Sequence, residues 1–128
     1  MQPPLETIRL SQQAKDRLIR LKALTGIEHW NVLCRWAYCL SLREPGEGPI
    51  SPPPSDSTVE MSWHTFAGEQ SNVFIALTRF AANVAGLGHD HTTLATFFRH
   101  HLHRGINILH RERPTLPSLL SAALKKDA

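Results

Sequence analysis

Reactive side chains crowd one short stretch, residues 25–42, which reads TGIEHWNVLCRWAYCLSL and holds a histidine, two cysteines, two tryptophans and an arginine. Cys34 stands beside Arg35, whose positive charge would favour a nucleophilic thiolate. Cys34 and Cys39 are five residues apart, so on a helix they point to different sides and form no C-x-x-C redox pair. Free cysteines in a reducing compartment behave as small apolar residues. We therefore interpret both cysteines as buried packing residues rather than as a catalytic site.

Histidines in the second half are the next candidates for chemistry, as metal ligands: His89, His91, His100, His101, His103 and His110. His100 and His103 would share one face of a helix, and such a pair binds a metal when a third ligand converges on it. The sequence holds no H-E-x-x-H motif and no phosphate-binding or nucleophile-elbow glycine motif. We expect no metal, no cofactor and no catalytic residue, and we assign the carboxylates of Glu69 and Asp90 to the starts of helices.

Charge is segregated along the chain, although the net charge is only +3. Residues 1–43 hold seven lysines and arginines against three acidic residues, and residues 99–128 hold six against two. The middle, residues 44–98, holds one against six. A chain of this kind can present basic surfaces to a polyanion, as nucleic-acid-binding proteins do, or it can simply have two solvated basic helices.

The chain is expected to begin with a short strand, LETIRLS. Ile8 and Leu10 would lie on its buried side, whereas Thr7 and Arg9 would lie on its exposed side. A lone strand of this length leaves its backbone groups unpaired, so we expect the strands of two chains to pair antiparallel. Thr7 and Arg9 would then project from a two-stranded ribbon that fits the major groove of DNA.

Two helices are predicted after this strand. Ser11 is a suitable N-cap, and residues 12–24 place apolar side chains at helical spacing. Gly26 would end this helix because glycine readily adopts a left-handed conformation, and residues 30–42 would form a second, mostly apolar helix. This order of elements is the ribbon-helix-helix pattern, in which the second helices of two chains pack together. The oligomer interface is therefore assigned to Leu33, Trp36 and Leu40.

The rest of the chain predicts a proline-rich loop and further helices, which makes the protein mainly α. The loop begins at EPGEGPISPPPSDS, where five prolines prevent a helix or a central strand. The predicted helices are residues 69–85, 92–109 and 117–124. The inward side of the first would consist of Val73, Leu77, Phe80, Ala81 and Val84. We predict one domain, residues 1–128, with a ribbon-helix-helix-like part (1–43), a loop (44–62) and a helical part (63–128).

The sequence predicts a cytoplasmic protein. No apolar run approaches the roughly 20 residues that span a bilayer. The start, MQPPLETIRLS, lacks the charged segment and apolar block of a secretion signal.

Three blocks of the sequence resemble one family, the DNA sulfur modification protein DndE. They are IRLSQQAKDRLIRLKALTGIEHWNVLCRWAYCLSLREPG, then FAGEQSNVFIAL in the middle, and HHLHRGINIL toward the end. The resemblance covers most of residues 5–110. Its most specific part is the ordered set R-L-S, T-G, N-V-L-C-R, G-E and H-x-x-R-G.

This resemblance implies a small subunit of the bacterial DNA phosphorothioation system, in which sulfur replaces a non-bridging oxygen of the DNA backbone. It implies a homo-tetramer that binds duplex DNA, notably nicked duplex, through basic surface residues. Sulfur-handling chemistry would belong to partner subunits, a cysteine desulfurase and an iron–sulfur sulfurtransferase. The residues carried over by position are Lys15, Arg17, Arg20 and Lys22. To these we add Arg9 on the strand and Arg104 on a later helix as candidate phosphate contacts.

Three functions thus remain in competition. The first is a DNA-binding subunit without enzymatic activity. The second is a ribbon-helix-helix transcription repressor, whose sequence preference would depend on Thr7 and Arg9. The third is a metal-dependent DNA nickase that would use Glu69, Asp90 and histidines.

Overall fold

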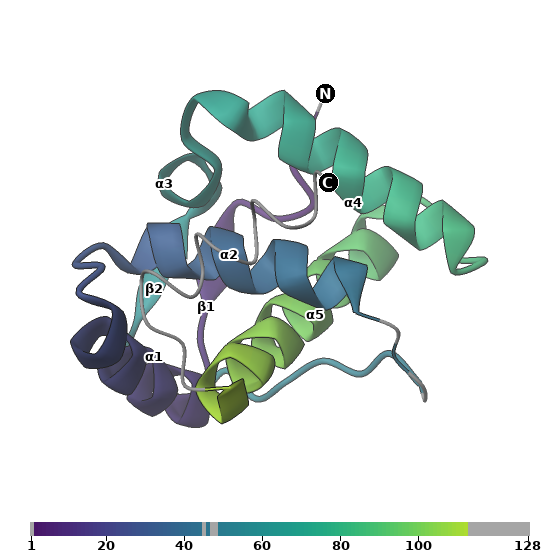
Figure 1. Ribbon diagram of the computed structural model, residues 1–128. Helices are drawn as coiled ribbons and strands as arrows, with labels where there is room; N and C mark the ends of the chain where they lie inside the picture. Colours follow the sequence, from purple (N-terminus) through teal and green to yellow (C-terminus); the bar gives the residue numbers. More distant parts are fainter. Residues whose placement is uncertain (1, 45, 47–48, 113–128) are drawn as a thin grey trace, which may run out of the picture.

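Two crossing helices, α2 (Trp30–Arg43) and α5 (His91–Glu112), form the centre of the fold (Figure 1). The structure, a computed structural model, describes residues 2–44, 46 and 49–112. The two helices approach most closely where Gly105 of α5 meets the backbone of Ala37 in α2. A Cβ atom added at Gly105 would lie only 1.8 Å from the carbonyl oxygen of Ala37. Glycine at position 105 therefore sets the distance between the two central helices.

The N-terminal strand, β1 (Thr7–Arg9), pairs antiparallel with β2 (Glu60–Ser62) of the same chain. In this register Ile8 lies opposite Met61, and Ile8 is fully buried as its place in the alternation predicted. The partner predicted from the sequence was the same strand of a second chain. The structure supplies β2 instead, so the two-chain ribbon of the ribbon-helix-helix pattern is not formed here. The predicted loop accordingly ends before residue 60.

Helix α1 (Gln12–Thr25) follows the prediction closely. The Ser11 side chain caps it by accepting a hydrogen bond from the Ala14 amide at 3.0 Å. At the other end Gly26 adopts a left-handed φ of 74°, and its amide donates to the Lys22 carbonyl. Glycine takes this conformation without the steric cost that a Cβ atom brings. These two local signals fix both ends of the helix.

Helix α2 is buried along most of its length, as its apolar composition predicted. Its buried residues are Leu33, Cys34, Ala37, Tyr38 and Ser41. Trp36 and Leu40 are only half-buried and pack against the edge of the core. The prediction that both cysteines are buried is wrong for Cys39, which is exposed.

The second half of the chain forms more elements than predicted. A short helix, α3 (Trp63–Ala67), is followed by a 3-10 turn, η1 (Gly68–Gln70), and then by α4 (Ser71–Val84). Of the five residues predicted to face inward on α4, only Leu77 and Ala81 pack against the core, and both are only partly buried. The buried residues of α4 are Phe74, Ile75, Thr78 and Ala82, whereas Val73, Phe80 and Val84 are exposed. The helix carries two apolar sides, and its periodicity alone could not decide which of them faces the core.

Aromatic side chains from four helices meet in the core between α2, α3, α4 and α5. The rings are those of Tyr38, Trp63, Phe66, Phe74 and Phe98, with centroid separations between 4.6 and 6.4 Å. The hydroxyl of Tyr38 lies 2.6 Å from the hydroxyl of Thr78, and burial raises the pKa of Tyr38. Edge-on ring contacts of this kind add to the energy of area burial. They attach α3 and α4 to the central helix pair.

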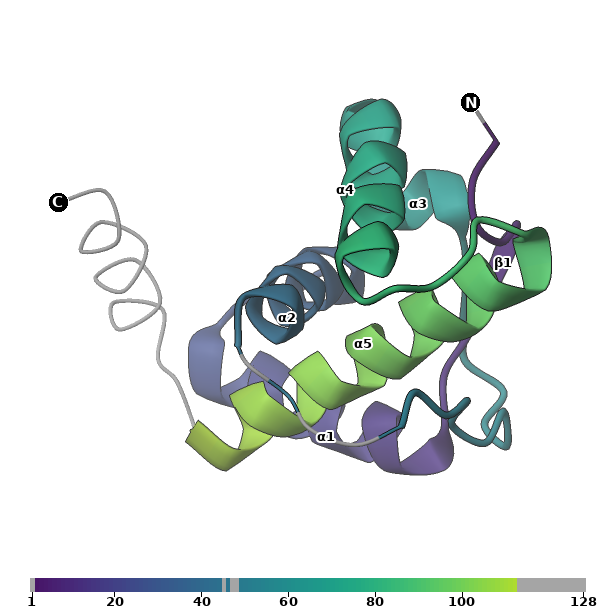
Figure 2. The same cartoon turned by 90° about the vertical axis from the view of Figure 1, so that its right-hand side faces the viewer.

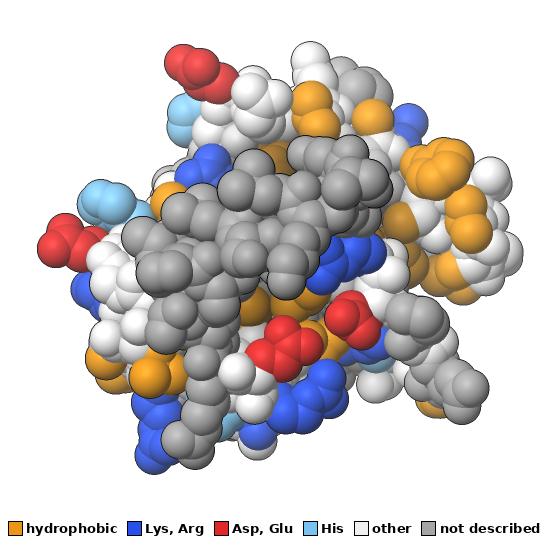
Figure 3. Space-filling model, viewed as in Figure 1, with side chains coloured by type: hydrophobic (Ala, Val, Ile, Leu, Met, Phe, Trp, Pro, Cys, Tyr) orange, Lys and Arg blue, Asp and Glu red, His pale blue; other side chains and the backbone are white. Residues whose placement is uncertain are grey.

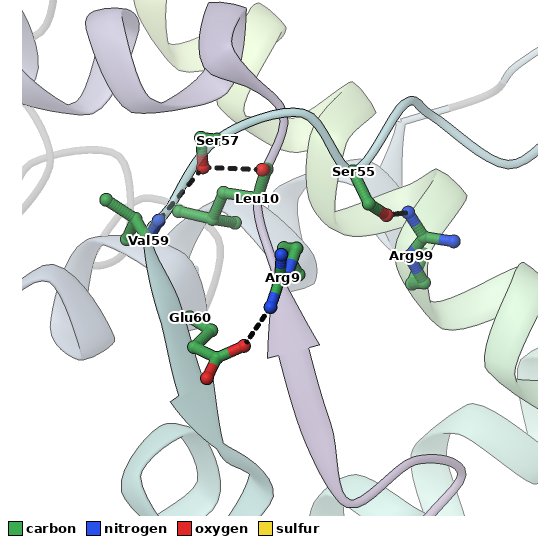
Figure 4. A network of polar contacts seen from close by, with 7 residues as sticks. All are labelled: Arg9, Leu10, Ser55, Ser57, Val59, Glu60 and Arg99. Carbon is green, nitrogen blue, oxygen red and sulfur yellow. Dashed lines mark hydrogen bonds and ion pairs between the residues drawn. The ribbon is translucent and has the colours of Figure 1, made fainter.

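The described part of the proline-rich segment, residues 49–57, runs along α5 and is held by polar contacts (Figure 4). The guanidinium of Arg99 donates to the carbonyl of Pro53 at 2.9 Å and to the hydroxyl of Ser55. Ser57 donates its hydroxyl to the carbonyl of Leu10 at 2.7 Å. Residues 53–57 are therefore fixed against α5 and the end of β1.

Figure 2 shows α5 between α4 above and α1 below. Within residues 2–44, 46 and 49–112, no helix has the length and apolar character needed to cross a membrane. The predicted closing helix, residues 117–124, lies outside the described residues.

Candidate nucleic-acid interface

The basic residues of α1 lie on two sides of the helix. The buried stripe of α1 consists of Ala14, Leu18, Leu21 and Thr25. Lys15 and Lys22 are seven residues apart, about two turns, and flank this stripe on one side. Arg17 and Arg20, three residues apart, flank it on the other. Figure 3 shows lysine and arginine side chains along the lower edge of the molecule, where α1 lies.

Exposure differs among these four cations. Arg20 and Lys22 are exposed, whereas Lys15 and Arg17 are half-buried. The outermost face of α1, between the two basic rows, consists of Gln12, Asp16, Ile19 and Ala23. Asp16 is the only acidic residue of the helix. The arrangement is a rod with positive charge along both flanks and a weakly charged face between them.

Helix α5 holds α1 in place through a row of polar side chains. His103 accepts a hydrogen bond from the Ser11 amide at 3.1 Å, at the start of α1. Asn107 accepts one from the guanidinium of Arg17. His110 lines a shallow groove with Arg20, Ala23 and Leu24. These contacts fix the orientation of the arginine side of α1.

This polar row on α5 was not predicted from the sequence. His103, Asn107 and His110 are spaced four and three residues apart, so they lie on one face of α5. The same spacing would have shown that this face is polar and meets another helix. The histidines were instead considered as metal ligands, and the polar residue between them was not considered.

The geometry of His103 determines its protonation. Its Nε2 accepts from the Ser11 amide, and its Nδ1 lies 2.8 Å from the carbonyl oxygen of Arg99, to which it donates. A ring with one acceptor and one donor nitrogen is neutral. Burial lowers the pKa of His103, which favours the same form. His103 thus has a structural role, in which it joins α5 to the start of α1.

Arg9 has a partner of its own. Its guanidinium forms an ion pair with the carboxylate of Glu60 at 2.8 Å, across the two strands (Figure 4). Both side chains are about half exposed. The local charge at Arg9 is therefore balanced, unlike that of α1. Its predicted contact with DNA stays a prediction.

Arg104 faces inward. Its Nη1 donates to the Ser41 carbonyl at 2.7 Å, to the Ser41 hydroxyl at 3.0 Å and to the Glu44 carbonyl at 3.2 Å. The last carbonyls of a helix have no partner within it, and a cation there also complements the helix dipole. Arg104 therefore caps the end of α2, and its predicted contact with DNA stays a prediction.

His101 belongs to the same cluster. Its Nδ1 lies 2.8 Å from the Ser41 hydroxyl. Burial, together with the nearby charges of His100 and Arg104, lowers the pKa of His101 to about 4. At neutral pH the imidazole of His101 is therefore uncharged.

The groups considered for catalysis have structural surroundings. Burial raises the pKa of Cys34 to about 12 and outweighs the opposing effect of Arg35, so the thiol is protonated. Asp90 caps α5 by accepting hydrogen bonds from the amide and the hydroxyl of Thr93, which lower its pKa. Glu69 is exposed on η1. Across the described part of the chain, no three histidine, cysteine or acidic residues lie close enough to hold a metal ion together.

The residues assigned to an oligomer interface occupy different environments. Leu33 is fully buried within the chain and leaves no surface for a second chain to contact. Trp36 and Leu40 are half-buried on α2. Their role in oligomer formation stays a prediction.

Comparison with known proteins gives one family. Residues 7–115 match the family described as DNA sulphur modification protein DndE. The fold is similar to a crystal structure of DndE from Escherichia coli B7A involved in DNA phosphorothioation modification, with a TM-score of 0.67 and 23% identity over 82% of this chain and 96% of that chain. It is similar also to a mutant DndE involved in DNA phosphorothioation, with a TM-score of 0.63 and 23% identity over 84% and 98% of the two chains. Among the curated proteins none matches the sequence.

Proposed function

The chain belongs to the DndE family of DNA sulfur modification proteins, and on this basis we propose that it is the DNA-binding subunit of a bacterial phosphorothioate modification complex. It binds duplex DNA through the two basic rows of α1, as part of a homo-tetramer. It does not itself transfer sulfur. It works in the cytoplasm, where bacterial DNA is, alongside the other subunits of the complex.

The charge distribution of α1 is the observation that carries this proposal. A helix of about 10 Å diameter fits the major groove, which is about 12 Å wide. Lys15 and Lys22 on one flank and Arg17 and Arg20 on the other are placed to reach the phosphates on both walls of such a groove. In the middle and last turn of the helix the face between them offers no group that reads bases, because Ile19 and Ala23 have no polar side-chain atoms, and only Gln12 and Asp16 in its first turns could do so. Binding through phosphates with little sequence preference follows.

A non-catalytic role fits the burial of Cys34. The thiolate is the nucleophilic form of cysteine, and Cys34 is buried and protonated. The sulfur-handling steps would then belong to partner subunits, a cysteine desulfurase and an iron–sulfur sulfurtransferase. We propose that this chain holds the DNA strand for them.

A preference for nicked duplex has a physical basis in the cost of bending DNA. Bending an intact site of 20 to 30 base pairs costs roughly 1 to 6 kcal/mol. A nick removes one backbone connection and lowers this cost. A protein that presents several copies of α1 around one site therefore gains more from a nicked duplex than from an intact one.

A salt titration with nicked and intact duplexes of equal sequence tests this function. Four phosphate contacts per chain give a slope of roughly −3.6 in log affinity against log salt concentration. The variant Lys15→Glu with Lys22→Glu should bind more weakly and with a shallower slope. The control Arg43→Glu removes an exposed cation on α2 instead and should bind like the wild type. If the double variant bound DNA with wild-type affinity, α1 would not be part of the binding surface.

A second experiment separates this function from sequence-specific repression and from nicking. Unrelated duplexes of equal length should compete equally well for the protein. Supercoiled plasmid incubated with pure protein and divalent metal should stay supercoiled. Strong preference for one sequence, or metal-dependent nicking lost in Glu69→Gln or Asp90→Asn, would contradict the proposal.

A further inference from the structure

The outer edge of β2 carries backbone groups that are free to pair with another strand. Val59 and Trp63, which flank β2, form backbone hydrogen bonds of 3.0 and 2.9 Å with residues on either side of β1. In an antiparallel pair, alternate residues exchange hydrogen bonds with the partner strand, and the residues between them turn their amides and carbonyls away. Glu60 and Ser62 are the residues between. Within the described part of the chain, their outward amides and carbonyls form no hydrogen bond.

A groove of about 370 Å³ lies beside this edge, between β2 and the turn that joins α1 to α2. Figure 1 shows β2 on the side of β1 that faces this turn. The apolar side chains in the wall of the groove are those of Trp30, Val59 and Met61, which are half-buried and pack against the core. The exposed residues around it are Lys22, Glu28, His29, Glu60 and Thr65. The groove thus combines an apolar floor with an unpaired strand edge.

The structure closes one end of this groove. The side-chain amide of Asn31, at the start of α2, donates a hydrogen bond of 3.2 Å to the carbonyl of Thr65 in α3. This bond holds the two walls together. Every residue that lines the groove belongs to the described part of the chain. The larger cavity at the end of α4, of about 580 Å³, differs in this respect, because its wall includes Gly46, whose neighbours in the chain are not described.

The hydrogen-bonding groups of the edge fit an extended polypeptide. An added strand supplies amides and carbonyls at the spacing of Glu60 and Ser62, and it sends alternate side chains to one face. A helix cannot do this, because its backbone groups are already bonded to one another. A DNA backbone offers acceptors alone, so it would leave the carbonyls of the edge without a donor.

Charge favours a peptide over DNA as well. The charged residues that line the groove are one lysine, Lys22, and two glutamates, Glu28 and Glu60. Glu60 is paired with Arg9, whereas Glu28 has no ion pair or hydrogen bond within the described residues. An unpaired carboxylate repels phosphate and attracts a basic side chain. The segment that fits the groove therefore has apolar residues at alternate positions and a basic residue beside them.

A second folded copy of the chain fits this edge poorly. Strand β2 is three residues long, and the turn between α1 and α2 stands beside it across the groove. A second copy that pairs through its own β2 would bring the same turn against this wall. A single extended segment has no such bulk and enters the groove alone.

We propose that the groove beside β2 binds an extended segment of a partner protein, which adds to the sheet as a third strand. Glu60 and Ser62 form backbone hydrogen bonds with the segment, and its alternate apolar side chains pack on Trp30, Val59 and Met61. Of the proposed DNA contacts on α1, Lys22 is the one that also lines this groove. The inference goes beyond DNA binding and does not depend on it.

A displayed library of random ten-residue peptides is the first probe, because the groove determines the chemistry of the segment and not its sequence. Peptides selected on the wild-type protein should have apolar residues at alternate positions and at least one basic residue. A selection that yields no binding peptide, or peptides without this alternation, would overturn the proposal.

Glu60→Pro tests the backbone pairing. Proline lacks the amide that Glu60 turns outward, and an edge strand tolerates proline where the amide faces away from the sheet. The selected peptides should bind this variant about tenfold more weakly, because one hydrogen bond is lost and a peptide carbonyl is left unpaired. The control Glu60→Ala also loses the ion pair with Arg9 but keeps the amide, so it should bind the peptides like the wild type. Equal binding by the two variants would refute the pairing.

Modified peptides give a test that leaves the protein unchanged. A methyl group on the peptide amides that turn toward β2 should abolish binding to the wild type, whereas methyl groups on the amides that turn away should be tolerated. If both peptides bound equally, the segment would not be a strand of the sheet.

Hydrogen exchange identifies the occupant of the edge. The amides of Glu60 and Ser62 should exchange quickly in the free protein and slowly with peptide bound. Slow exchange in the free protein would show that the edge is already occupied, for example by a second copy of the chain, and would contradict the proposal.

Duplex binding keeps this inference apart from the proposed function. Glu60→Pro and Glu60→Ala should bind DNA equally well, because both free Arg9 from its ion pair and neither changes α1. A wild type that binds the selected peptides but ignores DNA at low salt would refute the proposed function and leave this inference standing. A wild type that binds DNA but selects no peptide would do the reverse.

Discussion

Gly105→Ala tests whether the contact between α2 and α5 is as close as the structure has it. The added Cβ would lie 1.8 Å from the carbonyl oxygen of Ala37, 2.4 Å from its carbonyl carbon and 3.0 Å from its Cα. These atoms are backbone, so no side chain can rotate away. To restore an ordinary contact the two helices must separate by about 1.5 Å. A gap of even 0.5 to 1 Å forfeits roughly a quarter to a half of a van der Waals contact.

The expected loss of stability follows from this separation. Overpacking a core costs about 1 to 3 kcal/mol, and a clash between two backbones belongs at the upper end. Alanine in place of glycine within a helix returns about 1 kcal/mol. We therefore expect Gly105→Ala to lower the free energy of unfolding by about 2 kcal/mol.

Urea unfolding at one fixed protein concentration measures this change. The matched control is Gly88→Ala, because a Cβ there would lie 3.4 Å from the nearest atom, Asp90 Oδ1, which is an ordinary contact. The control should stay within about 0.5 kcal/mol of the wild type. A Gly105→Ala protein as stable as the control would refute the close approach of α2 and α5.

Three further predictions concern single contacts, each measured by urea unfolding. Stability should fall as the pH drops from about 6.5 toward 4. The unfolded chain then binds protons at His101 and His103, whereas their lowered pKa values keep both histidines neutral in the folded protein. The slope is at most about 1.4 kcal/mol per pH unit for each histidine, and it is smaller for the half-buried His101 because solvent screens its charge. A flat profile over this range would contradict it. Arg104→Met should destabilise by about 1 to 3 kcal/mol, because the carbonyls at the end of α2 lose their donor, whereas Arg43→Met nearby should be neutral. Ser11→Ala should cost about 1 kcal/mol through loss of the cap on α1, and no loss would mean that the cap bond is not formed.

Local signals in the sequence predicted the helices well. Ser11, Gly26 and Asp90 act within a few residues of their own position, and each caps or ends a helix as expected. The partner of β1 could not be found in this way. It lies about 50 residues further along the chain, after a segment whose prolines conceal any strand signal. The argument that a lone strand needs a partner predicted the pairing of β1, but it assigned the partner to a second chain rather than to β2.

The candidate site was predicted only in part, because some of its contacts join residues that are far apart in the sequence. Basic residues on α1 were identifiable, and helical geometry alone places them on two flanks. The contacts of Arg9 with Glu60 and of Arg104 with Ser41 join residues 51 and 63 positions apart. Only the folded chain shows that these two cations are already engaged. The exposed side of α4 could not be recognised either, because both sides of that helix are apolar.

Helix α5 contacts the start of α1, the proline-rich segment and the cavity at the end of α4. Its 22 residues span about 33 Å. Along that length His103 accepts a hydrogen bond at the start of α1, Arg99 donates one to the proline-rich segment, and His101 lines the cavity at the end of α4. The start of α1, the proline-rich segment and the end of α2 are therefore all attached to one continuous helix, so none of them can shift relative to the others without breaking a contact with α5.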